Sequence, residues 1–222
     1  MLTRCPNPRC RFQFEVPDDR AGKNGPCPNC GQVITFRSLD VLNEIERLHA
    51  QRSERPSGMK LADPDRPARF SALLEDIRSL WNVGSIFRSA DGAGFGELYL
   101  CGITGCPPNK AIAKTSLGAE EHLAWAHHNN ALDVLPKLVA KGVQIVALEK
   151  TETSVLLDDA IKSGALKPPL CLIVGNEVAG ISAEGLSQAA LVCHLPMRGM
   201  KTSLNVAVAF GIAAYAIRQA VD

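Results

Sequence analysis

The last quarter of the chain constrains the fold most, because it combines two short apolar runs with a long apolar helix. Residues 170–174 (LCLIV) and 191–195 (LVCHL) each read as a strand buried on both faces of a sheet. The segment 204–220 is apolar at nearly every position, which predicts a helix buried in a core or against another subunit. Glycines, amides, a hydroxyl and a carboxylate follow the two runs, at 175–177 and 197–205. Ligands bind at the carboxyl ends of strands in parallel α/β sheets, so we place the candidate site here.

The middle of the chain alternates strand-like and helix-like segments, which predicts a mostly parallel sheet flanked by helices. We expect strands at 70–77, 97–102 and 143–149 and helices at 86–93 and 130–141. The segment 103–121 reads as a long loop rich in Pro, Gly, Lys and hydroxyls. Its polar side chains either bind phosphate oxygens or face solvent; they are Lys110, Lys114, Thr115 and Ser116.

One glycine-rich stretch imitates a dinucleotide-binding motif. Gly92, Gly94 and Gly96 do not fit the G-x-G-x-x-G spacing, and a strand follows them where a helix is required. We interpret these glycines as the end of a helix. Upstream, Asn82 and Arg88 lie on a predicted turn that leads into this helix, where both side chains can face one cleft.

Four cysteines near the start of the chain are spaced as metal ligands. Cys5 and Cys10 form one pair, and Cys27 and Cys30 form the second. Two such pairs can complete a tetrahedral zinc site, and so small a segment has too little core to fold without one. We expect residues 12–16 and 33–36 to pair as a hairpin. The stretch resembles short zinc-ribbon modules with a CPxC…VPDDxAGK…CPxCG pattern.

Two disulfides or ordinary buried thiols are the alternative to zinc. No charged-then-apolar leader follows Met1, so we expect a cytoplasmic protein with reduced thiols, which favours zinc. The module's basic side chains either contact phosphate or are plain surface charges; they are Arg4, Arg9, Arg11, Arg20 and Lys23. No apolar stretch reaches the length of a membrane span.

Length and charge suggest one full domain with a small attachment. We divide the 222 residues into a zinc-ribbon-like module (1–37), a helix and linker (38–69) and an α/β domain (70–222). Within 38–69, the helix is predicted over 39–51, with Ser38 as its N-cap. Residues 1–69 hold 12 of the 24 Lys and Arg against 9 acids, a mild basic bias that permits a polyanionic partner.

Three segments together resemble the sequence motifs of the SpoU/TrmH family of RNA 2′-O-methyltransferases, in the SPOUT superfamily. They are 82–91 (NVGSIFRSAD), 173–182 (IVGNEVAGIS) and 195–207 (LPMRGMKTSLNVA). The resemblance covers about residues 70–222 and implies an α/β trefoil knot, an RNA substrate (tRNA or rRNA), and S-adenosylmethionine as the methyl donor. It also implies a homodimer with composite active sites, which would explain the apolar last helix.

The resemblance also assigns roles to individual residues. The cofactor pocket would be lined by Leu148, Glu149, Gly175, Leu195, Met197 and Leu204, with Gly175 allowing close approach of a backbone. The catalytic set would be Asn82, Arg88, Glu177, Ser203 and Asn205. Arg88 is expected to hold a phosphate and stabilise the developing oxyanion, because a guanidinium is not readily deprotonated. Glu177 is expected to brace the pocket, with Arg88 as a candidate partner, and Ser203 is also a plausible helix cap.

Two other interpretations stay open. The chain is either the enzyme or a non-catalytic RNA-binding or assembly protein that retains the fold; the complete polar set favours the enzyme, and a cofactor titration distinguishes the two. A zinc module fused to an unrelated nucleotide-binding enzyme is disfavoured, because phosphate-loop and dinucleotide motifs are missing.

Overall fold

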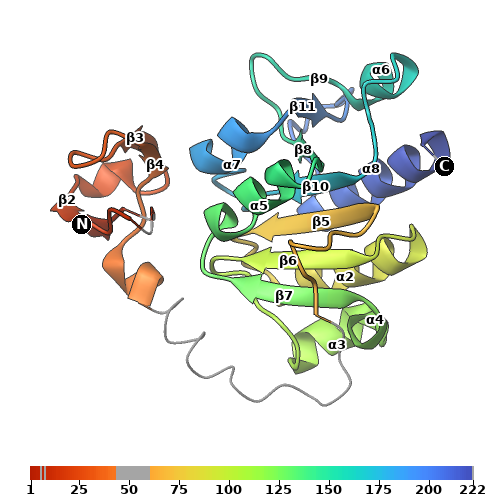
Figure 1. Cartoon of the computed structure of the whole chain (residues 1–222), viewed down its shortest axis with the longest axis horizontal. Helices are drawn as coiled ribbons and strands as arrows, with labels where there is room; N and C mark the ends of the chain where they lie inside the picture. Colours follow the sequence, from red (N-terminus) through yellow and green to blue (C-terminus); the bar gives the residue numbers. More distant parts are fainter. Residues whose placement is uncertain (6, 8, 44–60, 222) are drawn as a thin grey trace.

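The chain forms a small N-terminal module and a larger α/β domain. The computed structural model describes every residue except 6, 8, 44–60 and 222. In Figure 1 the module lies beside the arrowheads of β5 (Phe70–Glu75), β6 (Glu97–Cys101) and β7 (Ala124–His128), at the carboxyl ends of these strands. The module therefore sits at the edge of the sheet where a ligand site is expected.

The module consists of two local hairpins. In one, β1 (Leu2–Arg4) pairs antiparallel with β2 (Gln13–Glu15), and in the other β3 (Asn24–Pro26) pairs with β4 (Val33–Thr35). The 3-10 turn η1 (Asp18–Arg20) lies between them. The predicted pairing of 12–16 with 33–36 is wrong, because each strand pairs with its neighbour in sequence, which closes a shorter loop.

The segment after the module begins as predicted. Residues 39–43 are helical, and Ser38 Oγ accepts the amide of Val41 at 3.4 Å. The rest of the predicted helix 39–51 and most of the predicted linker lie outside the described residues.

The domain is built on a seven-stranded sheet in the order β7-β6-β5-β10-β8-β11-β9, with parallel pairing between all neighbours. Its other strands are β8 (Gln144–Leu148), β9 (Val155–Leu156), β10 (Leu170–Val174) and β11 (Leu191–His194). The predicted mostly parallel sheet is confirmed. β10 enters between β5 and β8, and β11 between β8 and β9, so late strands complete the sheet between earlier ones. The knot that the resemblance implies stays a prediction.

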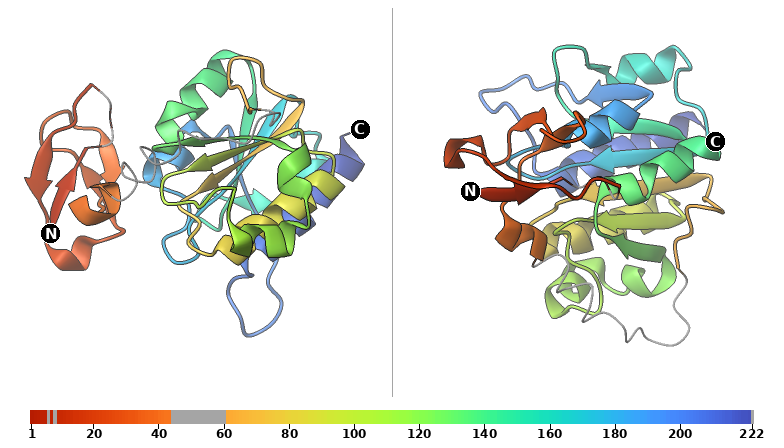
Figure 2. Two further views of the ribbon diagram at one scale, coloured as in Figure 1. Left: turned by 90° about the horizontal axis from the view of Figure 1, so that it is seen from below. Right: turned by 60° about the vertical axis from the view of Figure 1, so that its left-hand side comes forward.

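Both faces of the sheet are buried, which explains the continuous apolar runs. On β10, Leu172 and Val174 pack into a cluster with helices α2 (Leu80–Gly92) and α8 (Val206–Ala220), whereas Cys171 and Ile173 pack on the opposite face. The alternation follows from the period of two along a strand. Figure 2 (left) shows the sheet edge-on with helices on both sides.

Seven α-helices cover the sheet in the described part of the domain. They are α2 (Leu80–Gly92), α3 (Lys110–Ser116), α4 (Ala119–His122), α5 (Leu135–Ala140), α6 (Leu157–Lys162), α7 (Ala183–Gln188) and α8 (Val206–Ala220), with the 3-10 turn η2 (Ala131–Asp133) before α5. None of the helices in this part of the chain is both long and apolar enough to cross a membrane.

Several predicted boundaries are wrong. α2 starts at Leu80, with Ser79 as its N-cap, so Asn82 and Arg88 lie on the helix and not on a turn before it. The predicted loop 103–121 contains α3 and α4, and the predicted helix 130–141 is a 3-10 turn followed by α5. Asn205 caps α8 through its side-chain oxygen, which accepts the amide of Ala207 at 2.9 Å, so Ser203 is not the cap.

Candidate functional site

A cavity of about 360 Å³ opens at the carboxyl ends of β8, β10 and β11. The six residues predicted to hold a cofactor all line it: Leu148, Glu149, Gly175, Leu195, Met197 and Leu204. Parallel strands place their carboxyl ends at one edge, so segments far apart in the sequence meet here. Cavities of this size, with apolar walls and a few polar groups, suit small organic ligands.

The turn after β10 forms one wall of the cavity, and its glycines are required by its shape. A Cβ on Gly175 would lie 2.3 Å from the backbone of Gly180 and Ile181. Gly180 adopts a φ of +70°, and a Cβ there would lie 2.4 Å from the Glu149 carboxylate. The backbone that comes close to Gly175 therefore belongs to the turn itself. Glu149 in turn accepts the amide of Ile181 at 3.0 Å, which holds the turn to β8.

Three of the predicted catalytic residues form a continuous hydrogen-bonded chain. Asn205 Nδ2 donates to Asn82 Oδ1 at 3.1 Å, and Asn82 Nδ2 donates to Glu177 Oε1 at 3.1 Å. The Glu177 carboxylate also accepts the backbone amides of Arg78 and Ser79, each at 3.0 Å. The chain therefore joins the starts of α2 and α8 to the turn after β10, and Glu177 and Asn205 line the cavity.

The electrostatics of Glu177 follow from these donors. Burial alone would raise its pKa, but the amides of Arg78 and Ser79 and the side chain of Asn82 outweigh burial and lower it below the ordinary value. A carboxylate also suits the positive end of a helix dipole. Glu177 is therefore ionised at neutral pH and fixes the entry to α2.

The other two predicted catalytic residues are placed differently. Ser203 lines the cavity, in the segment between β11 and α8 that projects from the domain as a blue loop in Figure 2 (left). Arg88 is exposed and does not line the cavity. It lies six residues beyond Asn82, roughly 9 Å along the helix axis. Within one chain, the Glu177 carboxylate therefore accepts its hydrogen bonds from residues at the start of α2 and not from Arg88.

Further residues that the sequence had not assigned to the cavity also line it, among them Asn176, Gly180 and His194. Asn176 and Gly180 lie inside the motif at 173–182, which was the signal available for them. His194 is the last residue of β11, and its Nδ1 lies 2.9 Å from Ser154 Oγ. Its position at a strand end was the only sequence signal.

The polar residues of the predicted loop 103–121 are engaged within α3. Thr115 Oγ1 donates to the carbonyl of Trp81 at 3.1 Å, and Ser116 Oγ donates to the carbonyl of Ile112. Lys114 Nζ lies 5.7 Å from the centre of the Trp81 ring. The Thr115 hydroxyl therefore holds α3 to α2, whereas the Ser116 hydroxyl bonds within α3. Among these four side chains only the two lysines stay candidates for phosphate contacts.

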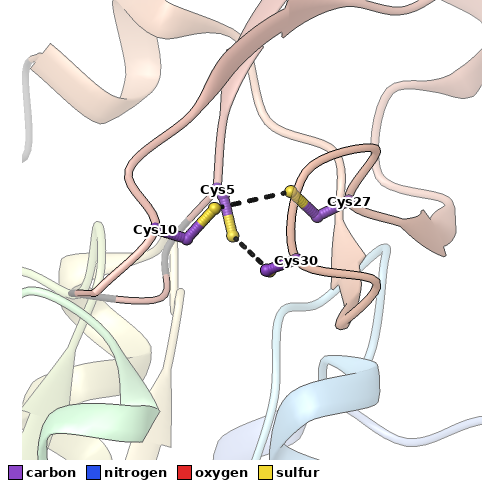
Figure 3. A group of neighbouring side chains, drawn as sticks. All are labelled: Cys5, Cys10, Cys27 and Cys30. Carbon is purple, nitrogen blue, oxygen red and sulfur yellow. Dashed lines mark hydrogen bonds between the residues drawn. The ribbon is translucent and has the colours of Figure 1, made fainter.

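The four N-terminal cysteines converge at one point between the two hairpins (Figure 3). Cys5 Sγ lies 3.7 Å from Cys30 Sγ, Cys10 Sγ lies 3.8 Å from Cys27 Sγ, and all four sulfurs lie within 4.8 Å of one another. The four cysteines are free thiols in this structure, since the sulfur atoms lie farther apart than an S–S bond. A hydrogen bond from Asn29 lowers the pKa of the Cys10 thiol to about 6.

Comparisons with known proteins agree with this geometry. The model of the SpoU rRNA Methylase family matches residues 69–215. YacO of Bacillus subtilis, whose name places it in the TrmH family of tRNA/rRNA methyltransferases, is 29% identical over 192 residues, covering 86% of this chain and 74% of the relative. The tRNA (guanosine(18)-2′-O)-methyltransferase of Escherichia coli is 27% identical over 150 residues, covering 68% of this chain and 63% of the relative.

A solved structure shares the fold. The AdoMet bound rRNA methyltransferase from Sinorhizobium meliloti superposes with a TM-score of 0.65 at 27% identity, over 72% of this chain and 61% of that chain. The fold and the cavity thus define an RNA methyltransferase class. The chain belongs to the SpoU rRNA Methylase family. The match spans less than two thirds of the Escherichia coli and Sinorhizobium proteins.

Proposed function

We propose that the chain transfers a methyl group from S-adenosylmethionine to a ribose 2′-hydroxyl of tRNA or rRNA. The observation that carries this proposal is the cavity at the carboxyl ends of β8, β10 and β11, which is lined by residues of the two later family motifs, 173–182 and 195–207. The Escherichia coli relative is named for 2′-O methylation of tRNA, and the Sinorhizobium structure for bound AdoMet.

The residues of the cavity fit such a cofactor. Leu195 and Leu204 offer apolar surfaces to an adenine ring, and the glycine turn at 175–180 presents backbone groups. When bound, the cofactor supplies an activated methyl group. The chain's task is to hold the acceptor hydroxyl in line with that methyl and to stabilise charge on its oxygen. Ser203 and Asn205, directly before the first turn of α8, would orient the ribose.

Arg88 is the residue that we propose stabilises the oxyanion and holds the adjacent phosphate. Since Arg88 does not line the cavity of its own chain, this role requires a second copy that brings the two together. α8 carries an exposed apolar stripe in which Val208, Ile212 and Tyr215 are each about half exposed (51%, 48% and 47%). Such a stripe suits a self-complementary dimer interface.

The stripe and Arg88 belong to neighbouring helices. A Cβ on Gly92 of α2 would lie 2.5 Å from Tyr215 Oη, and one on Gly211 of α8 would lie 3.4 Å from Ser89 Oγ. α2 and α8 therefore pack side by side, with Arg88 next to the contact at Ser89. A homodimer built on this face would position Arg88 at a composite site.

We also propose that the four cysteines hold a structural zinc ion. Four thiolates at about 2.3 Å from a zinc ion define a tetrahedron with edges of about 3.8 Å. The sulfur separations of 3.7 and 3.8 Å match those edges. A site closed by four protein ligands is structural rather than catalytic. Thiolate-bound zinc and an RNA substrate both suit the cytoplasm, where we place the protein.

The experiment is a cofactor titration followed by methyl transfer. Isothermal titration with S-adenosylmethionine tests the cavity, and transfer of labelled methyl to total tRNA and rRNA, with mapping of 2′-O-methyl positions, tests the reaction. Arg88→Ala is expected to lower kcat by about 10²–10³-fold and to leave cofactor affinity unchanged, because one stabilising donor of the transition state is lost. Arg66→Ala is the matched control, because Arg66 is also an exposed arginine outside the cavity lining.

The outcomes separate the alternatives. Cofactor binding without transfer to any RNA would favour the non-catalytic RNA-binding protein, and absence of cofactor binding would overturn the proposal. Full turnover by Arg88→Ala would remove Arg88 from the mechanism.

A further inference from the structure

Three buried carboxylates of the domain converge behind the cavity wall. Glu75 ends β5, Asp76 follows it, and Glu184 lies in the first turn of α7; their exposures are 4%, 5% and 5%. Burying carboxylates is costly unless cations or hydrogen-bond donors meet them. Burial is the main cause of the raised pKa of Glu75, and the neighbouring Asp76 adds to it. A positively charged side chain beside these carboxylates would therefore stabilise them.

The N-terminal module supplies that partner. The Arg37 guanidinium forms an ion pair with the Asp76 carboxylate, and Glu75 and Glu184 also attract it. Two residues earlier, Thr35 donates its amide and its hydroxyl to Glu184 at 2.9 and 3.2 Å. Arg37 directly follows Phe36, which packs in one buried cluster with Cys5 and Cys27. The core that contains the cysteines thus carries Arg37 to the domain.

The same acidic residues hold the turn that forms the cavity wall. The carbonyl of Asp76 accepts Asn176 Nδ2 at 2.7 Å, and Asn176 Oδ1 accepts the amides of Val178 and Ala179, each at 2.9 Å. Ser182 donates its amide and hydroxyl to Glu75 at 2.9 and 2.6 Å. Both ends of the segment 176–182 are therefore tied to the pair of acids that faces Arg37.

Asp76 is itself held in an unusual backbone conformation. Its φ is +56°, which costs free energy for any residue with a side chain. Its carboxylate accepts the amide of Ile103 at 3.0 Å in addition to pairing with Arg37. Contacts on both sides of the carboxylate thus keep the Asp76 carbonyl aimed at Asn176.

The module also lies next to the turn 176–182. A Cβ on Gly22 would lie 3.9 Å from the Ala179 side chain, and a second cavity of about 270 Å³ is lined by both the module and residues 176–182. Asn176 and Gly180 line this cavity on one side and the candidate cofactor cavity on the other. The turn is thus a shared wall between the module and the site.

We propose that Arg37 is a positioning residue for the cofactor cavity: by pairing with Asp76 it fixes the turn 176–182, so that docking of the N-terminal module sets the affinity for the cofactor. The choice of ligand rests on the proposed function, whereas the effect on the turn does not. The module is therefore part of the site's wall and not only an attachment.

The first test is a titration of S-adenosylmethionine into the full-length wild type, Arg37→Met and Arg9→Met. Met keeps much of the length of the arginine side chain and removes its charge. Arg9→Met is the matched control, because Arg9 is an exposed arginine of the same module, whereas Asp76 pairs with Arg37. We expect Kd to rise about tenfold in Arg37→Met and to stay unchanged in Arg9→Met. Equal affinities in all three proteins would overturn the inference.

Rescue and a double mutant distinguish positioning from general destabilisation. Arg37→Lys is expected to recover part of the affinity. Asp76→Asn removes the same ion pair and tolerates the positive φ, so Arg37→Met/Asp76→Asn is expected to bind no more weakly than the weaker single variant. Strictly additive losses would contradict coupling through this pair. Circular dichroism and thermal unfolding verify that each variant is folded.

Hydrogen exchange without cofactor provides a readout that is independent of the proposed function. We expect amides of 176–182 to exchange faster in Arg37→Met than in Arg9→Met, with unchanged exchange in β6 and β7. Unchanged protection of this segment would overturn the inference even if cofactor binding weakened. If the wild type binds no cofactor, the proposed function fails, and this measurement still decides the role of Arg37.

Discussion

The module and the domain bury apolar groups on very different scales. Among the described residues of the module, the buried cluster consists of Cys5, Cys27, Ile34 and Phe36, so half of it is thiol. In the domain, two large clusters cover the two faces of the seven-stranded sheet. Burial is sufficient to define the larger fold, whereas the smaller one has little apolar core of its own, which is why we propose a zinc ion at its centre. The difference in buried core leads us to expect that the two parts are stabilised by different chemistry.

The largest expected effect is the loss of one sulfur from the cluster. Cys27→Ser removes a ligand, and zinc supplies about 10 kcal/mol or more to small folds of this kind. We expect the module to unfold while the sheet stays folded. Metal content by mass spectrometry and hydrogen exchange of residues 1–37 against 70–222 measure the two parts separately.

A thiol of the domain is the control for this experiment. Cys106→Ser changes a half-buried cysteine outside the cluster and is expected to leave both metal content and module exchange unchanged. If Cys27→Ser retained full protection of the module, the contrast between the two regions would be lost.

A smaller effect on stability and cofactor affinity is expected when a glycine with a positive φ is replaced in the domain. Gly180→Ala places a side chain at a φ of +70°, where its Cβ would meet Glu149, whereas Gly164→Ala does so at +67° with open space around it. The left-handed conformation costs both variants about 1–2 kcal/mol. Only Gly180→Ala is expected to weaken cofactor binding. Unfolding curves and calorimetric titrations of the pair separate backbone strain from distortion of the cavity, and equal cofactor affinities would show that the turn tolerates the change.

The smallest effect concerns Glu177 and its dependence on pH. Its pKa is below the ordinary 4.5, so its hydrogen bonds stabilise the fold fully above pH 4.5, and the stabilisation is lost as pH falls through the lower folded value. Glu177→Gln is expected to cost at most about 1 kcal/mol at neutral pH, because the group is partly exposed. The cost should shrink below pH 4.5. Denaturant unfolding of both proteins between pH 3 and 7 measures it, and a cost independent of pH would exclude the ionised carboxylate as the cause.

Much of the fold could be predicted because its signals are local. The strand β10 and the helix α8 could be recognised from the pattern of apolar residues alone. β7 was missed, since its sequence AWAHH alternates weakly and ends in two histidines. The hairpins of the module were paired wrongly because pattern identifies strands and not their partners.

The site divides in the same way. The six cavity residues were predictable from the family resemblance, since four of them lie inside its motifs, and all six line one cavity. The partner of Glu177 and the cap of α8 depend on where helices begin, which sequence locates poorly. The role of Arg37 could not be predicted from the sequence, because its partner Asp76 is 39 positions away and the ion pair forms only when the module packs against the domain. Whether Arg88 reaches a neighbouring cavity depends on a second chain.

The position of β10 between β5 and β8 affects how the protein is made. Leu170 pairs with Phe70, so one edge of β5 stays unpaired until residues 100 positions later have been synthesised. At about 5–20 residues per second, this interval lasts roughly 5–20 s on the ribosome. During that time the nascent β5–β6–β7 layer has an open edge able to recruit stray strands. We therefore expect the chain to need chaperone protection during translation, when aggregation competes most strongly with folding.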